Sequence, residues 1–177
     1  SKVSSKLKVI KNLSKISDDV LTGGGITNTI LKAQGHNIGL SLHEDSMLND
    51  AKELLDTGKI LLPDEVVVSK DIESNNTRVT KVNSVQHDEI ILDQILSPAI
   101  IKKIIQAKKI IWNGPVGVFE RQPFSLGTKA LAEAIASSQA FSLAGGGETL
   151  LAIKIFIEKI NISYCSTGGG AFLEFME

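Results

Sequence analysis

Three glycine triplets constrain the fold of this chain more than any other feature of its sequence. They occupy residues 23–25, 145–147 and 168–170, and each follows a short apolar run and opens a segment with helical periodicity. Glycine allows a sharp turn at the end of a strand and a close approach of the backbone to a ligand. A helix that begins there offers unpaired N–H groups and a partial positive charge, which suit phosphate. One such turn can be a tight connection and nothing more, but three in 177 residues predict a cradle for a polyphosphate.

Apolar runs alternate with amphipathic segments along most of the chain. Helices are expected over 2–16, from the first triplet to about residue 34, and over 44–57, 98–107 and 127–137, and strands over 19–22, 60–68, 89–92, 109–112, 141–144 and 162–166. The strand over 60–68 would be kinked at Pro63, and residues 77–82 alternate like an exposed antiparallel ribbon. This pattern predicts an α/β fold: a three-layer, Rossmann-like domain whose parallel sheet has helices on both faces. The ligand crevice of such a sheet lies at the carboxyl ends of the strands, where the triplets fall.

The composition is that of an ordinary soluble globular protein. Of the residues, 42% are hydrophobic and 22% charged, and the net charge of −1 gives no basic field for nucleic acid or an anionic membrane. The apolar runs are too short to span a bilayer. The single cysteine, Cys165, excludes an internal disulfide, and its apolar surroundings favour a buried, inert thiol over a reactive one. Without a disulfide, a reducing cytoplasmic location is expected. The three histidines show no metal-ligand spacing and are expected at the surface.

Common nucleotide-binding signatures are missing from the sequence. No triplet fits G-x-x-x-x-G-K-[ST], and none fits G-x-G-x-x-G with an acid about 20 residues later. Three other segments are far more specific: WNGPVGVFE at 112–120, GGGET at 145–149 and STGGGAFLEF at 166–175. Together with KVSSK at 2–6, and with Thr29 after the first triplet, they closely resemble phosphoglycerate kinases in order and spacing.

The resemblance covers essentially the whole chain, but only the carboxyl-terminal half of such a kinase. In that family this half is the nucleotide-binding domain, and the other half binds 3-phosphoglycerate. The resemblance therefore implies that residues 1–177 form one nucleotide-binding domain without the amino-terminal domain. It also implies the lack of one core strand, because the family has a buried strand immediately before the position of Ser1.

Several residues acquire phosphate-binding roles through the resemblance. Lys2 and Lys6 are four residues apart, so both ammonium groups project from one helix face, which in isolation would be a solvated helix start. In the family, Lys6 would contact the nucleotide phosphates and Lys2 would hold the phosphoryl group in transit. Nucleotide and phosphoryl contacts are also implied for a set of backbone and hydroxyl groups, at Gly23, Gly24, Gly146, Gly147, Thr149 and Gly169.

The resemblance further implies a nucleoside pocket lined by Asn113, Pro115, Val118 and Glu120, with the Glu120 carboxylate on the ribose hydroxyls. A loop glutamate taken alone is usually just solvated. Near the base, the family tends to have glycine before a proline where this chain has Ser97, whose side chain would narrow the pocket.

Glu148 is the implied ligand of Mg²⁺, the metal bound with ATP or ADP. The family has an aspartate there, so the carboxylate is shifted by about one methylene, and Mg²⁺ demands near-octahedral geometry. The alternative is a structural one, in which Glu148 only complements the dipole of the helix that it opens.

The implied reaction is the glycolytic one: reversible phosphoryl transfer between ATP and the carboxyl group of 3-phosphoglycerate, giving ADP and 1,3-bisphosphoglycerate in a monomeric enzyme. Positioning and charge stabilisation by lysines, glycine N–H groups and Mg²⁺ would supply the catalysis. This chain alone is expected to be inactive, because it carries no acceptor site. The alternative is a non-catalytic nucleotide-binding module or an inactive remnant.

Overall fold

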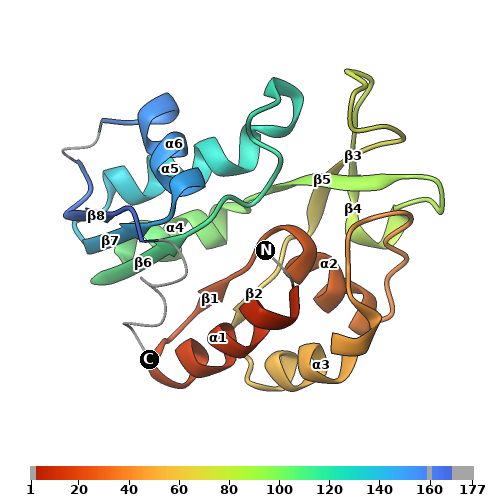
Figure 1. Ribbon diagram of the computed structural model, residues 1–177, viewed down its shortest axis with the longest axis horizontal. Helices are drawn as coiled ribbons and strands as arrows, with labels where there is room; N and C mark the ends of the chain where they lie inside the picture. The colour runs from red at the N-terminus through yellow and green to blue at the C-terminus, as the bar shows by residue number, and fades with distance from the viewer. Residues whose placement is uncertain (1–2, 159–160, 169–177) are drawn as a thin grey trace. The chain divides into compact units, whose positions relative to one another are not determined.

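The structure is a computed structural model that describes residues 3–158 and 161–168 (Figure 1). The chain divides into two compact units, residues 1–95 and 96–177. Both units combine helices with strands, and two of their sheets are parallel, so the expected α/β class is confirmed. One continuous parallel sheet was expected, but the described residues form three separate sheets, of which one is antiparallel.

Three helices form the main core of the first unit. They are α1 (Val3–Ile16), α2 (Gly24–Ala33) and α3 (Leu48–Asp56), the last preceded by the short helix η1 (Asp45–Met47). All three were expected from the helical spacing of apolar residues, and their apolar faces meet in one buried cluster. Its members are Val3, Leu7, Ile26, Ile30, Ala51 and Leu54. This packing fixes the start of α2, where the first glycine triplet lies.

Two short strands, β1 (Val20–Leu21) and β2 (Ile60–Leu61), pair in parallel beside these helices. A second sheet has the order β4-β3-β5 and is antiparallel throughout, with β3 (Glu65–Ser69) between β4 (Arg78–Lys81) and β5 (Ile90–Ile95). The expected ribbon over 77–82 is therefore confirmed, and the helix η2 (Val82–Ser84) follows it.

The prediction of one kinked strand over 60–68 was wrong. Its two halves belong to different sheets, because β2 pairs with β1 whereas β3 pairs with β4 and β5. Pro63 between them has no N–H to give to a ladder, and its ring restricts the preceding residue. The chain therefore leaves one sheet at the proline and enters another.

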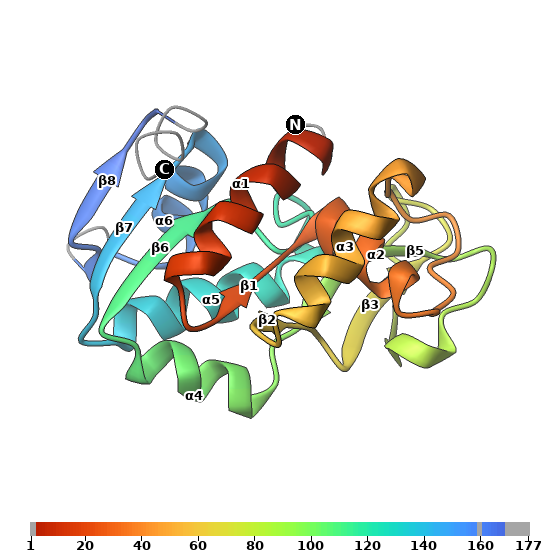
Figure 2. The same cartoon turned by 90° about the horizontal axis from the view of Figure 1, so that it is seen from below.

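The second unit contains the sheet β6-β7-β8, which is parallel throughout. Its strands are β6 (Lys109–Asn113), β7 (Phe141–Gly145) and β8 (Tyr164–Ser166), and its helices are α4 (Pro98–Gln106), α5 (Leu126–Ser137), α6 (Gly147–Phe156) and the short η3 (Gln122–Phe124). The three strands run side by side, and α5 contacts both α4 and α6 (Figure 2). The helices α4 and α5 and the strands β6 and β7 lie where the sequence predicted them, within a residue. The α6 helix follows the second triplet as expected, and β8 covers the last part of its predicted run. Among the helices described, none is both long enough and apolar enough to cross a membrane.

Candidate active site

The carboxyl ends of β6, β7 and β8 lie level with one another in the second unit. Asn113 is the register partner of Gly145, and Gly145 is the partner of Ser166. The side-chain amide of Asn113 donates to the carbonyl oxygen of Gly145 at 2.7 Å, which ties the two strand ends together. The ends of the strands and the helix that follows β7 therefore form the edge at which the sequence predicted a ligand.

The second glycine triplet makes the turn from β7 into α6. Gly146 has φ +97°, a left-handed conformation that favours glycine, and its N–H donates to the carbonyl of Ser166 at 3.2 Å. Gly147 begins the helix on an exposed surface with open space where a side chain would project. The first N–H groups of a helix have no acceptor within it. Because the N–H of Gly146 is engaged, the donors that α6 can offer to an anion begin at Gly147.

Thr149 links this helix to the turn after β6. Its hydroxyl accepts a hydrogen bond from the N–H of Gly114 at 2.7 Å, and Gly114 has φ +101°. Thr149 is only 1% exposed. A hydroxyl that accepts one hydrogen bond still has its own hydrogen to donate. Thr149 therefore holds the start of the loop in place and retains one donor.

The loop after β6 is anchored by its apolar residues. Val116 and Phe119 are buried, and the ring of Phe119 packs edge-on against Phe156 of α6 with 6.3 Å between centroids. This anchoring leaves Pro115 and Val118 half-buried, while Glu120 is exposed. The loop thus presents two partly exposed apolar side chains and a carboxylate after the end of β6.

Glu120 and Glu148 form no hydrogen bond or ion pair with any residue that the structure describes, and Glu148 is exposed in the first turn of α6. No group of three or more His, Cys, Asp or Glu residues within 3–158 and 161–168 could hold a metal ion. A single exposed carboxylate does fit Mg²⁺, which commonly takes one or two carboxylates plus substrate phosphates and water. Glu148 is the residue that could contribute to such a site.

Ser97 caps a helix of this unit. Its hydroxyl accepts from the N–H of Ile100 at 3.2 Å and so caps the amino terminus of α4, with Pro98 at the first helical position. The side chain that differs from the family pattern is therefore committed to its own helix.

The first unit contains the remaining site residues that the structure describes. Gly23 precedes α2 as its N-terminal cap residue, and Gly24 has φ +56° with open space around it. Lys6 lies on α1, half-buried, and pairs with no residue in the described part of the chain. Lys2 and Gly169 lie outside the described residues.

The carbonyl and hydroxyl groups around the first triplet are held by buried side chains. The amide of Gln94 donates to the carbonyl of Thr22 at 2.8 Å, and the hydroxyls of Thr22 and Thr27 share a hydrogen bond of 2.7 Å. The hydroxyl of Thr29 donates to the carbonyl of Gly25 at 2.7 Å. The turn is therefore fixed on both sides of the glycines.

Leu42 is a residue of this region that the sequence did not single out. It is 71% exposed, yet a Cβ on Gly25 would lie only 3.3 Å from its side chain, so Leu42 stands directly beside the first triplet. Nothing in the local sequence distinguishes it from any other leucine in a polar loop. Its position depends on contacts between distant segments.

A separate hollow of about 350 Å³ lies on the antiparallel sheet of the first unit, between β3, β4 and the loop that joins them. Three of its charged groups are paired: Arg78 with Glu89 at 2.6 Å, and Lys70 with Asp88 at 3.2 Å. The Asp71 carboxylate accepts from the N–H of Glu73 at 3.0 Å.

Comparison with known proteins agrees with this description. The model of the phosphoglycerate kinase family matches residues 1–177. A phosphoglycerate kinase of Vibrio campbellii is 50% identical over 182 aligned residues, which cover all of this chain and 47% of that protein. Among solved structures, that of phosphoglycerate kinase from Coxiella burnetii matches with a TM-score of 0.90 at 42% identity, over 99% of this chain and 47% of that one. The crystal structure of the kinase from Pyrococcus horikoshii matches with a TM-score of 0.79 at 32% identity, over 99% and 46%. This chain spans about half the length of these relatives. From the matched motifs, the fold and these relatives together, the chain belongs to the phosphoglycerate kinase family.

Proposed function

We propose that this chain is the nucleotide-binding half of a phosphoglycerate kinase and that it binds MgADP and MgATP. The observation that carries the proposal is the level edge of β6, β7 and β8, where Asn113 is tied to the end of β7 and Gly114 to Thr149 of α6. Beside this edge, Glu120 and Glu148 pair with none of the residues that the structure describes. Such an edge is where open α/β sheets bind ligands. The family to which the chain belongs supplies the chemical class of that ligand.

The proposed contacts follow the geometry of each unit. In the second unit, the N–H of Gly147 and the hydroxyl of Thr149 would donate to phosphate, and Glu148 would contact Mg²⁺. Gly146 has its N–H engaged, so its contribution would be the sharp turn itself. Residues of the loop would line the nucleoside site, namely Asn113, Pro115, Val118 and Glu120. Ser97 would act there only by its bulk, because its hydroxyl caps α4.

In the first unit, Lys6 and Lys2 are the proposed phosphate contacts, and the Gly23–Gly24 turn is a proposed nucleotide contact. Lys6 is half-buried and pairs with no described residue, so its ammonium group is available to a phosphate. We add Leu42, whose exposed side chain beside the first triplet offers an apolar surface of the kind that covers a base. Gly169 remains a proposed N–H donor to the transferred phosphoryl group.

The proposed reaction of the intact enzyme is phosphoryl transfer between ATP and 3-phosphoglycerate, with a carboxyl group as acceptor. This chain alone would bind nucleotide without transferring phosphate, because the proposed contacts are all on the nucleotide side. The alternative is a non-catalytic nucleotide-binding module.

An assay of phosphoryl transfer with and without a separately purified amino-terminal domain of a related kinase distinguishes the kinase half from the binding module. Transfer that appears only in the mixture supports the kinase, and nucleotide binding without transfer in the mixture supports the module.

Replacing Glu120 by alanine is expected to weaken MgADP binding about tenfold while leaving inorganic tripolyphosphate binding unchanged. The reason is that the Glu120 carboxylate would accept hydrogen bonds from the ribose, and a charged hydrogen bond is worth about 1.5–3 kcal/mol. Calorimetric titration of both ligands into both proteins checks this, with Glu133→Ala on α5 as a surface control. Equal affinity of wild type and variant for MgADP would remove Glu120 from the site.

Replacing Glu148 by aspartate is expected to strengthen ADP binding in the presence of Mg²⁺ and to leave it unchanged without the metal. The shorter side chain draws the carboxylate back by about one methylene, toward the geometry that Mg²⁺ has in the family. Both residues carry the same charge at the same helix end, so a purely dipolar role predicts no difference. ADP titrations of both proteins with Mg²⁺ and with EDTA distinguish the two roles. If Mg²⁺ enhances ADP binding equally in both proteins, Glu148 only complements the helix dipole and does not bind the metal.

A further inference from the structure

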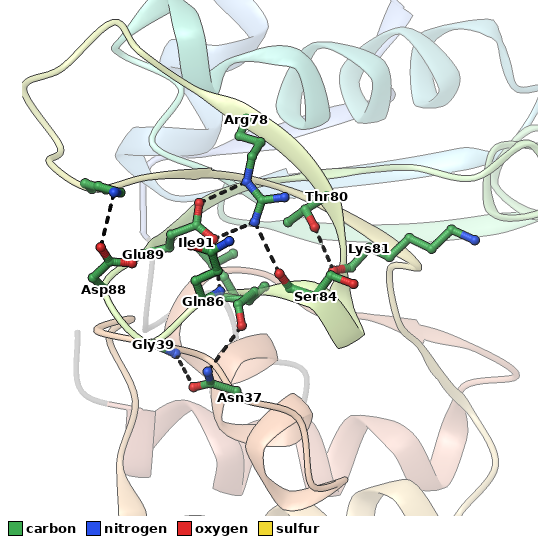
Figure 3. Close-up of polar contacts among 12 residues, drawn as sticks. Asn37, Gly39, Arg78, Thr80, Lys81, Ser84, Gln86, Asp88, Glu89 and Ile91 are labelled. Atoms are coloured by element: carbon green, nitrogen blue, oxygen red, sulfur yellow. Dashed lines mark hydrogen bonds and ion pairs between the residues drawn. The ribbon is translucent and has the colours of Figure 1, made fainter.

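Glu89, just before β5, is a buried carboxylate with three N–H donors around it. Arg78 on β4 donates to it through Nε at 3.1 Å and through Nη2 at 2.6 Å, and the N–H of Gln86 donates at 2.9 Å (Figure 3). The guanidinium also reaches the carbonyl of Ser84 at 3.2 Å. The Arg78 hydrogen bonds hold the pKa of the Glu89 carboxyl below its usual range, although burial opposes this. We call Arg78 and Glu89 the β4–β5 clamp, because together they fix the segment that joins these strands.

The clamped segment holds a second loop, at residues 37–42, by its backbone. The N–H of Leu40 donates to the carbonyl of Glu89 at 2.8 Å, and the N–H of Ile91 donates to the hydroxyl of Ser41 at 2.8 Å. Asn37 donates to the carbonyl of Val85 at 3.2 Å (Figure 3). The loop is pressed so closely on the segment that a Cβ on Gly39 would lie 2.1 Å from the carbonyl oxygen of Glu89. A displacement of Glu89 would therefore displace the loop.

The same loop carries Leu42 to the first glycine triplet. The carbonyl of Leu42 accepts from the side-chain amide of Asn28 on α2 at 3.0 Å, and the N–H of Glu44 donates to the hydroxyl of Thr29 at 3.2 Å. The Leu42 side chain contacts the position of Gly25. A continuous series of hydrogen bonds and contacts therefore runs from Arg78 through Glu89 and the loop to the triplet.

We propose that Arg78 and Glu89 are positioning residues for the nucleoside part of the nucleotide site, acting by holding the 37–42 loop and its exposed Leu42 against the Gly23–Gly25 turn. This inference rests on the proposed function, because it presumes that a nucleotide binds at that turn. Neither residue would contact the ligand. Since the coupling runs to an apolar side chain and not to a phosphate donor, it should affect binding of the base and not of the phosphates.

The test compares Arg78→Met and Glu89→Gln with wild type in titrations of MgADP and of magnesium tripolyphosphate into the 177-residue chain. We expect MgADP affinity to fall about fivefold, in the range usual for coupling between sites, and tripolyphosphate affinity to stay unchanged. Lys70→Met is the matched control, because it removes the exposed ion pair to Asp88 on the same sheet. Unchanged MgADP affinity, or an equal loss for both ligands, would overturn the proposal.

A double-mutant cycle with Leu42→Ala tests whether the effect passes through the loop. If it does, Arg78→Met should have little further effect on MgADP binding once Leu42 is truncated. Additive losses in the double variant would show that Arg78 acts by another route, and would contradict the inference. If Arg78→Met does not fold, Arg78→Lys and Glu89→Gln carry the same cycle, since lysine keeps the charge of Arg78 and glutamine keeps the size of Glu89.

Hydrogen exchange separates a failure of this inference from a failure of the proposed function. The N–H of Leu40, bonded to Glu89, should exchange faster in Arg78→Met and Glu89→Gln than in Lys70→Met. If wild type does not bind MgADP, the proposed function fails together with the nucleotide role of the clamp. If MgADP binds but Leu40 exchanges equally in all variants, the clamp does not hold the loop, and only the inference fails.

Discussion

Gly39→Ala is expected to lower the free energy of unfolding by about 3 kcal/mol, more than other glycine substitutions in the first unit. Gly39 has φ +58°, which an alanine adopts only with strain, and its new Cβ would lie 2.1 Å from the carbonyl of Glu89 and 2.6 Å from that of Gln86. Both neighbours are backbone atoms in a hydrogen-bonded segment, so they cannot rotate away. The loop and the β4–β5 connection would have to separate.

Gly58→Ala is the matched control for this result. Gly58 also has a positive φ, +70°, but nothing lies within 4 Å of its Cβ position. Its substitution should cost only the conformational strain, about 1–2 kcal/mol. Urea unfolding of the two variants and wild type measures both values. Equal losses would show that the loop moves freely away from Glu89, against the close packing described above.

Thr149→Val should destabilise the second unit by about 1–3 kcal/mol, because the N–H of the half-buried Gly114 would lose the hydroxyl that accepts its hydrogen bond. Valine has nearly the same shape, so the change removes the hydroxyl and little else. Thr149→Ser keeps the hydroxyl and serves as the control.

The valine variant should also bind nucleotide more weakly. Its turn after β6 would loosen, and with it the loop that carries Glu120, whereas the serine variant should keep its nucleotide affinity. Thermal unfolding and MgADP titration of both variants check this. A valine variant as stable as the serine variant would show that the 2.7 Å bond is not needed.

The second unit was largely predictable from the sequence, because its signals are local. Each strand is a short apolar run, helices follow β6 and β7, and the 145–147 triplet marks the turn between β7 and α6. Parallel pairing of strands that alternate with helices follows from those signals. The role of Ser97 was also accessible in principle, since serine before proline at a helix start is a capping pattern.

The first unit was less predictable, because long-range pairing decides it. The run 60–68 is apolar throughout, and nothing local shows that its two halves join different sheets. The position of Leu42 beside Gly25 also depends on distant segments. Asn28 donates a hydrogen bond to its carbonyl, and the N–H of Ile91, 50 residues from Ser41, donates to the Ser41 hydroxyl. The site residues themselves were inferred through resemblance to a family and not from periodicity or charge. Membership of that family is now shown, whereas the role of each residue stays a prediction.

Titration of MgADP into the 177-residue chain tests the central claim most directly. The account predicts saturable binding of MgADP that MgATP displaces. Lys6→Ala and Glu120→Ala should each weaken this binding, whereas Lys70→Met should not. A chain that is folded by circular dichroism and hydrogen exchange, yet gives no saturable binding of MgADP at millimolar concentrations, would contradict it.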